Sequence, residues 1–322
     1  MRVLITGGAG FIGSHLADAF LARGDSVVVA DDMSRGLPER VDPRASLHTL
    51  SVRDGPALTA LATEHRPALI CHLAAHIDVR ASVADPAADA QVNVVGTVNV
   101  LEAARAAGAR VVLASSGGAL YGRDVVIPSP ETAPLRPESP YGTAKLAAEN
   151  YLDMYNRQHG TRHATLRLAN VYGPRQDPAG EAGVVALFCA GALAGRAPVV
   201  YGDGTQTRDY VHVGDTVRAF LAAADAGRPG TWNIGTGLQT SVLDLLAMVA
   251  EAAGRPMAPE FGEHRPGDLP HSAVDPGLAA DDLGWRPVTR LADGVRQVFR
   301  WIEAGAPANA PAWAGASVPA GG

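Results

Sequence analysis

Two side chains that can move a proton, Tyr141 and Lys145, stand four residues apart in the segment SPYGTAK (139–145). The segment is predicted to begin a helix, and residues i and i+4 lie on one helix face. A phenol with a pKa of about 10 is a weak base at neutral pH, and each unit of depression requires about 1.4 kcal/mol. A neighbouring ammonium group is one source of that stabilisation. The same spacing is common on helix surfaces, so its meaning depends on what accompanies it.

Three glycines far upstream give the pair its context. Gly7, Gly10 and Gly13 follow the apolar run VLIT (3–6) in GGAGFIGSH and open a predicted helix. Such a strand-to-helix turn lets backbone N–H groups approach a pyrophosphate at the positive end of the helix. A tight structural turn is the alternative interpretation, because glycine spacing by itself is a weak signal.

Two carboxylates strengthen the nucleotide-binding interpretation. Asp31 and Asp32 end the next predicted strand, about twenty residues beyond the glycines, where a carboxylate accepts hydrogen bonds from the adenosine ribose. A 2′-phosphate would be repelled there, which favours NAD over NADP, although Arg35 could soften that preference. An oxidised nicotinamide ring is then a second positive charge beside Tyr141. The sequence therefore predicts an NAD-binding protein in which Tyr141 and Lys145 manage proton and hydride transfer.

These residues require a sheet that brings distant turns to one edge. Apolar runs that look like buried parallel strands alternate with helical patterns in the first half of the chain. The runs are 3–6, 26–31, 69–74 and 109–116, and the helical patterns are 13–23, 56–64 and 90–107. A further helix from Pro140 to about His159 and a strand-like stretch at 161–173 follow. We expect an α/β fold with a Rossmann-like doubly wound parallel sheet.

The second half is predicted to be a smaller, mixed α/β domain on the substrate side. Residues 173–209 are rich in glycine, proline and charge around one apolar helix at 184–195, and further helical patterns cover 213–226, 240–253 and 289–304. We predict an NAD-binding domain at 1–172 with a return segment near 209–232, and a substrate domain at 173–304. The uncharged residues 305–322 are predicted to form a disordered tail.

Composition narrows the functional classes. Of 322 residues 47% are hydrophobic and 19% charged, which is ordinary for a globular protein. The net charge of −6 argues against nucleic acid or an anionic membrane as the main partner. Cys71 and Cys189 are the only cysteines and have no metal-ligand spacing, so neither a disulfide framework nor a metal site is expected. The first residues resemble neither a signal peptide nor a spanning helix, and we expect a cytoplasmic protein.

Ordered motifs along nearly the whole chain carry a family resemblance. They are TGGAGFIGSH (6–15), HLAA (72–75), VNVVGTVNVLEAA (92–104), SSGGALYG (115–122), SPYGTAK (139–145), LRLANVYGPRQ (166–176), GDGTQTRDYVHVGD (202–215) and RPGDLP (265–270). The chain resembles the extended short-chain dehydrogenase/reductases, specifically the NAD-dependent nucleotide-sugar epimerase/dehydratase family. It is most similar to the UDP-glucose (UDP-galactose) 4-epimerase branch.

The resemblance implies roles for particular residues. Tyr141 would be the catalytic acid and base, and Lys145 would bind the nicotinamide ribose. We choose Ser116 as the third catalytic residue, because the position that carries this hydroxyl in many relatives is Gly117 here. The implied cofactor site comprises Gly7, Gly10, Phe11, Ile12, Gly13, Asp31, Asp32, Asp54, Leu73, Ala74, Ala75, Asn93, Ser115, Tyr141 and Lys145. The implied substrate site comprises Ser116, Gly117, Tyr141, Asn170, Arg208, Arg265, Asp268 and His271. Forked guanidinium groups such as Arg208 and Arg265 suit a nucleotide diphosphate.

One position departs from the family pattern. Many relatives have a Ser or Thr where this chain has Gly117, leaving Ser116, Ser115 or a water to contact the sugar hydroxyl. Relatives that dehydrate or decarboxylate carry an acidic residue in this loop, whereas Gly117 and Gly118 supply none. Epimerisation needs only the tyrosine, the lysine and a cofactor that returns the hydride it took.

The implied activity is inversion at C4 of UDP-glucose or UDP-galactose through a 4-keto intermediate. UDP-glucuronate, with Arg175 or loop hydroxyls near its carboxylate, and dTDP-sugars stay open as alternative substrates, and a non-catalytic NAD sensor is the alternative from another class. His271 would limit the size of the C2 substituent. The resemblance also implies a homodimer that pairs the helices at 90–107 and 141–159.

Overall fold

A seven-stranded parallel sheet forms the centre of the protein. The computed structural model describes residues 1–178, 183–264 and 269–306. Its main sheet has the order β11-β6-β5-β4-β1-β2-β3, and every neighbouring pair is parallel. The strands are β1 (Arg2–Thr6), β2 (Ser26–Asp31), β3 (Ser46–Thr49), β4 (Leu69–His72), β5 (Arg110–Ser116), β6 (Ala164–Leu168) and β11 (Gly230–Ile234). The predicted α/β fold with a doubly wound parallel sheet is confirmed.

The strand order reverses beside β1. The chain runs outward from β1 to β2 and β3, then crosses back to β4 and continues through β5 and β6. In sheets of this kind ligands bind beyond the carboxyl ends of the strands at such a reversal. We therefore expect a ligand site at the turns after β1, β2, β4 and β5.

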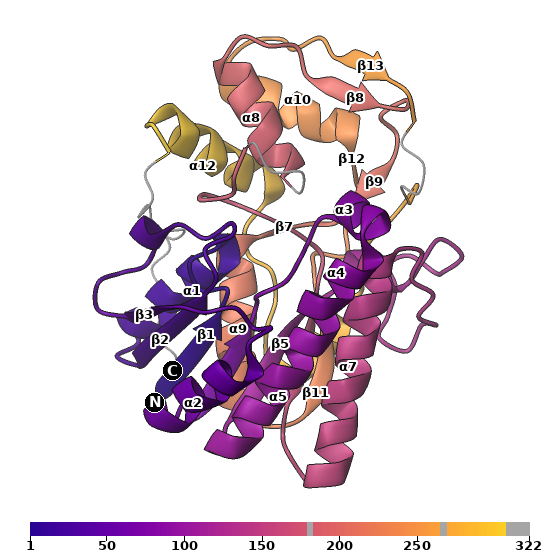
Figure 1. Cartoon of the computed structure of the whole chain (residues 1–322). Helices are drawn as coiled ribbons and strands as arrows, with labels where there is room; N and C mark the ends of the chain where they lie inside the picture. Colours follow the sequence, from indigo (N-terminus) through magenta and orange to yellow (C-terminus); the bar gives the residue numbers. More distant parts are fainter. Residues whose placement is uncertain (179–182, 265–268, 307–322) are drawn as a thin grey trace.

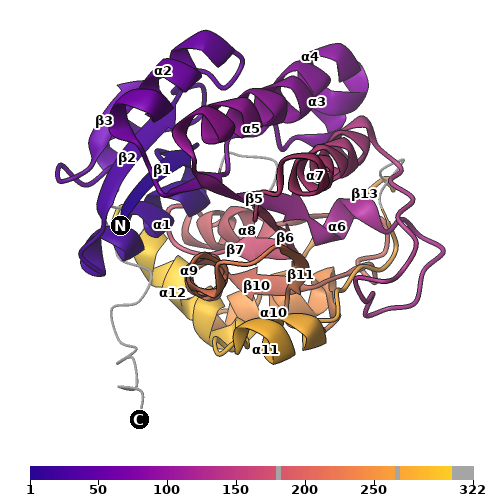
Figure 2. The ribbon, with the colours of Figure 1, turned by 90° about the horizontal axis from the view of Figure 1, so that it is seen from below.

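Helices cover both faces of the sheet (Figure 2). α1 (Phe11–Ala22) and α9 (Val213–Ala226) pack together on one face. α2 (Gly55–His65), α5 (Gly96–Ala107) and α7 (Pro140–His159) lie on the other. Each face has its own apolar core, because strands buried on both sides present side chains alternately to the two helical layers.

The predicted helix at 90–107 is wrong in detail. The structure has α3 (Val79–Ala84), α4 (Pro86–Ala90), a single π-helical turn η2 (Gln91–Val95) and then α5. A π turn inserts one extra residue into a helix and is frequent at functional sites. Hydrophobic periodicity continues through such a turn, which is why the pattern predicted one uninterrupted helix.

The predicted strand at 161–173 is divided between two sheets. β6 ends at Leu168, and after Ala169 the chain continues as β7 (Asn170–Tyr172), which pairs with β10 (Tyr210–His212). The segment thus leaves the main sheet at its carboxyl edge and enters the second half of the protein. Asn170 stands at this crossing.

The second half of the chain lies over that edge (Figure 1). Its centre is a three-helix cluster of α8 (Val184–Leu193), α10 (Val242–Ala253) and α12 (Leu291–Glu303) with a shared apolar core. Short paired strands flank the cluster: β8 (Val199–Tyr201) with β13 (Glu260–Gly262), and β9 (Thr207–Arg208) with β12 (Thr240–Ser241). The remaining short elements are η1 (Pro38–Arg40), α6 (Gly117–Leu120) and α11 (Gly277–Leu283).

Segments 209–234 return to the first half. α9 packs against α1, and β11 extends the main sheet beside β6. The division into two domains near residue 173 stays a prediction, and the part of the predicted tail at 307–322 lies outside the described residues. Within the described ranges no helix has the length and apolar character needed to cross a membrane.

Candidate active site

The turn after β1 can be made only by glycine at two of its positions. Gly7 has φ +72°, and a Cβ placed on it would lie 2.7 Å from the backbone nitrogen of Ala74. A Cβ on Gly13 would lie 2.1 Å from the carbonyl oxygen of Gly7. Gly10 is the N-cap residue of α1 and has no side chain to accept a hydrogen bond. No capping side chain therefore accepts from the backbone N–H groups of the first turn, which includes Phe11 and Ile12. This cradle fits a dinucleotide pyrophosphate.

The end of β4 forms the second wall of the cradle. The backbone N–H of Leu73 donates to the Thr6 carbonyl oxygen at 3.1 Å, and that of Ala74 donates to the Thr6 hydroxyl at 3.4 Å. These contacts hold residues 73–75 against the glycine turn at the point where the strand order reverses. Leu73, Ala74 and Ala75 therefore lie beside the glycine turn, and their contact with a cofactor stays a prediction.

Asp31 lies buried at the carboxyl end of β2. Its Oδ2 accepts from Ala9 N at 3.0 Å and its Oδ1 from Met33 N at 2.9 Å, so the carboxylate ties β2 to the glycine turn. Burial raises the pKa of Asp31, and the two N–H donors oppose that rise. Each oxygen keeps a lone pair for a ribose hydroxyl. Asp32 is exposed and binds the Ser34 hydroxyl and N–H instead.

Two other predicted cofactor residues are engaged elsewhere. Asp54 is exposed and caps α2 by accepting from Ala57 N at 3.0 Å. Asn93 in the π turn is buried, and its amide bonds His76 N, His76 O and Asp89 Oδ1 at 2.9–3.0 Å. Its side chain is thus taken up in holding the loop after β4 to α4. A direct contact of Asp54 or Asn93 with a cofactor stays a prediction.

Tyr141, Lys145 and Ser116 converge between α7 and β5. Ser139 caps α7 by accepting from Gly142 N at 3.1 Å. One turn on, Lys145 Nζ donates to the Ala114 carbonyl oxygen at 3.0 Å and lies 6.0 Å from the centre of the Tyr141 ring. The side chain of Ser116 acts to lower the pKa of Tyr141. The structure thus places Ser116 beside the tyrosine.

The protein's own groups raise the pKa of Tyr141. Burial raises this pKa to about 12, while the side chain of Ser116 acts in the lowering direction. Lys145 is also buried, and burial lowers its pKa to about 8. The expected lowering of the Tyr141 pKa depends on the charges of Lys145 and of the nicotinamide ring together, and it stays a prediction.

Ser115 belongs to a buried polar network. Its hydroxyl donates to Glu149 Oε1 at 2.5 Å, and Glu149 forms an ion pair with Arg167 at 2.7 Å. Arg167 also donates to the Tyr121 hydroxyl at 3.0 Å, which donates to Asn233 Oδ1 at 2.7 Å. The network joins α7, β5, β6 and β11 directly behind the catalytic pair. Glu149 was missed in the sequence, although it stands four residues after Lys145 on the same helix face.

The glycine loop after β5 faces the second half of the chain. A Cβ on Gly117 would lie 2.7 Å from Val274 Cγ1, so Val274 occupies the place of a side chain there. A Cβ on Gly118 would lie 3.5 Å from Asn170 Oδ1, so Asn170 lies beside the loop. The structure thus brings Gly117 and Asn170 together with Ser116, as a shared substrate site requires.

Arg208 and His271 are also brought together. Arg208 Nη1 donates to the carbonyl oxygens of Thr207 and Leu269, both at 2.8 Å. His271 is exposed, and its Nδ1 lies 3.0 Å from the Thr207 hydroxyl. The two residues line one loop junction of the second half. Arg265 and Asp268, the other predicted substrate residues of this loop, lie outside the described residues.

Arg175 is paired with a carboxylate of α1. It is 1% exposed and forms an ion pair with Asp18 of α1 at 2.7 Å. Its neighbour Pro174 accepts a contact of 2.9 Å from the His15 ring. Arg175 is therefore built into the packing of α1, and the suggestion that it meets a substrate carboxylate is not supported by its position.

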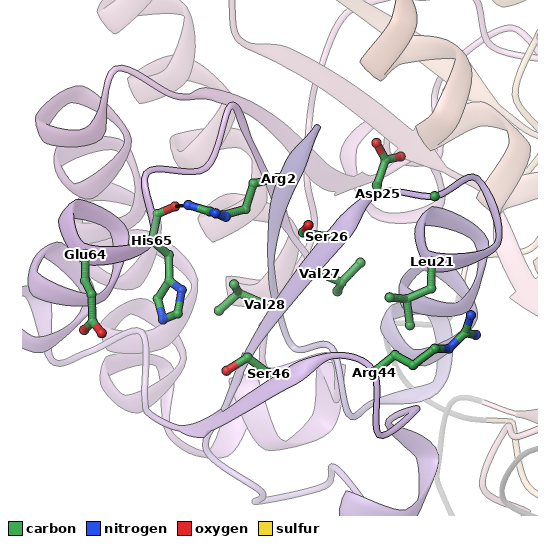
Figure 3. A pocket seen from close by; sticks show the side chains of 11 residues that line it. Arg2, Leu21, Asp25, Ser26, Val27, Val28, Arg44, Ser46, Glu64 and His65 are labelled. Carbon is green, nitrogen blue, oxygen red and sulfur yellow. Dashed lines mark hydrogen bonds between the residues drawn. The ribbon is translucent and has the colours of Figure 1, made fainter.

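A surface hollow lies at the other end of the sheet (Figure 3). It is lined by Arg2, Ser26 and Ser46, the first residues of β1, β2 and β3, together with Arg44 and Glu64. Ligands of doubly wound sheets bind at the carboxyl ends of strands, and this hollow lies at the amino ends. No group of three metal-ligating side chains occurs among the described residues.

Comparison with known proteins agrees with this geometry. A family model described as the NAD dependent epimerase/dehydratase family matches residues 3–235. The chain belongs to this family. It is an NAD-dependent epimerase-type enzyme, which confirms the family, enzyme class and cofactor predicted from the sequence.

Several relatives of this epimerase are similar over nearly their whole length. A UDP-glucose 4-epimerase from Mycolicibacterium smegmatis is 48% identical over 314 residues, with 94% of this chain and 98% of the relative covered. The structure of a UDP-glucose 4-epimerase with UDP-glucose from Thermotoga maritima is 41% identical, with a TM-score of 0.93 and coverage of 95% and 99%. A Thermus thermophilus UDP-glucose 4-epimerase in complex with NAD is 42% identical, with a TM-score of 0.88 and coverage of 94% and 99%.

Proposed function

We propose that this epimerase interconverts UDP-glucose and UDP-galactose by inversion at C4. The observation that carries the proposal is the convergence of Tyr141, Ser116 and Lys145 at the carboxyl edge of the sheet, next to a loop without an acidic side chain. The relatives named UDP-glucose 4-epimerase support the choice of substrate. Dehydration of the sugar would need a further acid or base in the 115–118 loop.

In this proposal each group of residues has a separate role in cofactor binding or catalysis. The glycine turn and the first turn of α1 hold the pyrophosphate of NAD, and Asp31 holds its adenosine ribose. Bound NAD supplies reversible oxidation at C4. Tyr141 takes the proton of the C4 hydroxyl, directly or through Ser116, and later returns it to the other epimer. Lys145 holds the nicotinamide ribose and keeps a positive charge near the phenol.

Substrate binding is assigned to the second half of the chain. Arg208, fixed by two carbonyl oxygens, is positioned to meet a diphosphate, because an oriented guanidinium loses little freedom on binding. Anchoring at the nucleotide end leaves the sugar free to present either face, which inversion at C4 requires. Asn170 and the Gly117–Gly118 loop would then border the sugar.

The test is a substrate panel. The purified protein is incubated separately with UDP-galactose, UDP-glucose, UDP-glucuronate and dTDP-glucose, and the products are separated by chromatography. We expect UDP-glucose from UDP-galactose without added cofactor. Conversion of UDP-glucuronate alone would replace the proposed substrate, and no conversion of any sugar would favour the NAD sensor.

The cofactor is predicted to be NAD and not NADP. Asp31 is buried with its charge at the ribose end of the cradle, where a 2′-phosphate would be repelled. Cofactor released from the purified protein by acid or heat is identified by mass. Recovery of mainly NADP would overturn the role of Asp31 and would indicate that Arg35 binds the 2′-phosphate.

We propose that the enzyme is a homodimer. Val95 of η2 and Tyr151 of α7 are 41% and 40% exposed, so the helical layer keeps apolar side chains on its outer surface. Pairing of these layers about a two-fold axis would cover them, since closed two-fold dimers are the commonest oligomers. Light scattering at micromolar concentration should give twice the chain mass, and a monomeric mass would contradict the proposal.

We also propose a cytoplasmic location. Cys71 and Cys189 are buried and free, and a reducing compartment preserves thiols in that state. Fractionation of producing cells with an antibody to the protein would test this, and recovery from the extracellular medium would contradict it.

His271 is predicted to limit the C2 substituent of the sugar. Its imidazole is bulkier than serine and is held at Thr207, next to Arg208. We expect His271→Ser to raise kcat/KM for UDP-N-acetylglucosamine by about tenfold relative to UDP-glucose. A steric clash that involves a few substrate atoms changes the ratio of kcat/KM values by about this factor. Equal kcat/KM values of the wild-type enzyme for UDP-N-acetylglucosamine and UDP-glucose would contradict the role assigned to His271.

A further inference from the structure

One buried carboxylate on a helix beside α7 uses only one of its two oxygens in the described structure. Asp89 of α4 is 2% exposed. Its Oδ1 accepts from Asn93 Nδ2 at 2.9 Å, whereas its Oδ2 is buried and has no hydrogen-bond partner among the described residues. A buried charge with half of its acceptors unused is costly for the fold, and such groups are otherwise rare.

Asp89 lies on a helix that packs against the catalytic helix. α4 and the π turn η2 both pack against α7, the helix that carries Tyr141 and Lys145. The negative charge of Asp89 raises the pKa of both residues. Asp89 therefore acts on the two groups at once, without forming an ion pair with Lys145 in the part of the chain that the structure describes.

The other titratable groups around this point are few. Burial raises the pKa of Asp89, whereas Asn93, His76 and Lys145 act to lower it. Glu149 also acts on Lys145, but it already forms an ion pair with Arg167. On the neighbouring α3, Arg80 is exposed and Asp78 caps the helix. The other titratable side chain near Lys145 is His72 of β4, whose pKa burial lowers to about 3, so it is neutral.

Lys145 is unusual in this chain because it is the single lysine. The 27 basic residues other than histidine are Lys145 and 26 arginines. An arginine stays charged in any protein environment, whereas a buried lysine readily loses its proton. Lys145 is 4% exposed, and burial lowers its pKa to about 8, which is close to the working range of a cytoplasmic enzyme. Its charge therefore depends on a nearby negative group.

We propose that Asp89 is a positioning residue that keeps Lys145 protonated at neutral pH and sets the ionisation of the Tyr141–Lys145 pair. The proposal rests on the proposed catalytic use of that pair. The field of a carboxylate favours the ammonium form of a lysine and the neutral form of a tyrosine. Neutralising Asp89 therefore lowers the pKa of both, and both limbs of a bell-shaped pH profile of kcat move to lower pH.

The single lysine allows a direct test. Protein with its bound cofactor is produced with isotope-labelled lysine, so that Lys145 supplies the side-chain NMR signal, and the signal is titrated in the wild type and in Asp89→Asn. We expect the midpoint to fall by about one pH unit, the size of a single charge acting at short range in a partly buried site. The matched control is Asp153→Asn, which removes an exposed carboxylate from the same helix as Lys145 and should leave the midpoint in place.

The outcomes separate positioning from packing. Asp89→Asn keeps the shape of the side chain and removes a half-satisfied buried charge, so its Tm should not fall. If this variant does not fold, Asp89→Ser removes the same charge and should give the same shift. An unchanged midpoint in either folded variant overturns the proposal, even in an active epimerase. Because the titration requires no turnover, failure of the proposed activity would be recognised separately.

Discussion

Tyr141→Phe is expected to lower kcat for UDP-galactose by about 10³-fold, with little change in KM. The phenol is the group that must take and return the C4 proton, and Phe keeps its ring but cannot do so. Ser116 cannot replace it, since a serine hydroxyl is a far weaker acid. The helix that carries this ring still packs against α3 and β5, so the fold should be retained. Initial rates for wild type and variant under identical conditions check the result.

The same helix provides a matched control for this substitution. Tyr151 lies ten residues further along α7 and is 40% exposed. Tyr151→Phe removes an identical hydroxyl away from Ser116 and Lys145, and should change kcat by less than about twofold, as expected for a surface site. A Tyr141→Phe enzyme with more than a tenth of the wild-type kcat would show that another group moves the proton.

Gly13→Ala is expected to destabilise the protein by about 3 kcal/mol and to abolish retention of NAD. The added Cβ would lie 2.1 Å from the carbonyl oxygen of Gly7 and 2.8 Å from the Cα of Gly8. Both are backbone atoms, so the turn between β1 and α1 must open to accept the methyl group. Opening it moves the N-terminus of α1 away from the position that holds a pyrophosphate. Urea denaturation and the NAD content of the purified protein measure the two effects.

Gly10→Ala is the comparison for this turn. Its Cβ would meet only the Gly7 carbonyl oxygen, at 3.2 Å, which a small adjustment relieves. We expect stability within about 1 kcal/mol of the wild type, although NAD can still be weakened because the pyrophosphate approaches the backbone there. Equal destabilisation by the two variants would mean that the close contact at Gly13 is not what shapes the turn.

The sequence contains most of the information about the first half of the fold. The strand predicted at 26–31 and the helix predicted from Pro140 to His159 match β2 and α7 at both ends. Both segments are long, strongly patterned and bounded by clear signals, in the case of α7 by Ser139 and Pro140 at the start. The edge strands β3 and β11 were not predicted, because four or five half-polar residues carry little periodicity.

Some features of the candidate site could be predicted from the sequence, and others could not. Tyr141, Lys145 and the glycine turn are local motifs, and their joint occurrence in this order along the chain indicates what they do. The pairing of Ser115 with Glu149, the closeness of Val274 to Gly117 and the burial of Asp89 depend on contacts between segments far apart in the chain. The rise in the pKa of Tyr141 has the same origin, since desolvation is set by the whole surrounding fold.

The central claim is that hydrogen removed from C4 is returned to C4 while Tyr141 moves the hydroxyl proton. UDP-galactose deuterated at C4 is converted in ordinary water without added cofactor, and the UDP-glucose formed is analysed by mass. The account predicts that the deuterium is retained at C4, because hydride returns from an enclosed site and does not exchange with water. UDP-glucose that has lost the deuterium to solvent would contradict the account.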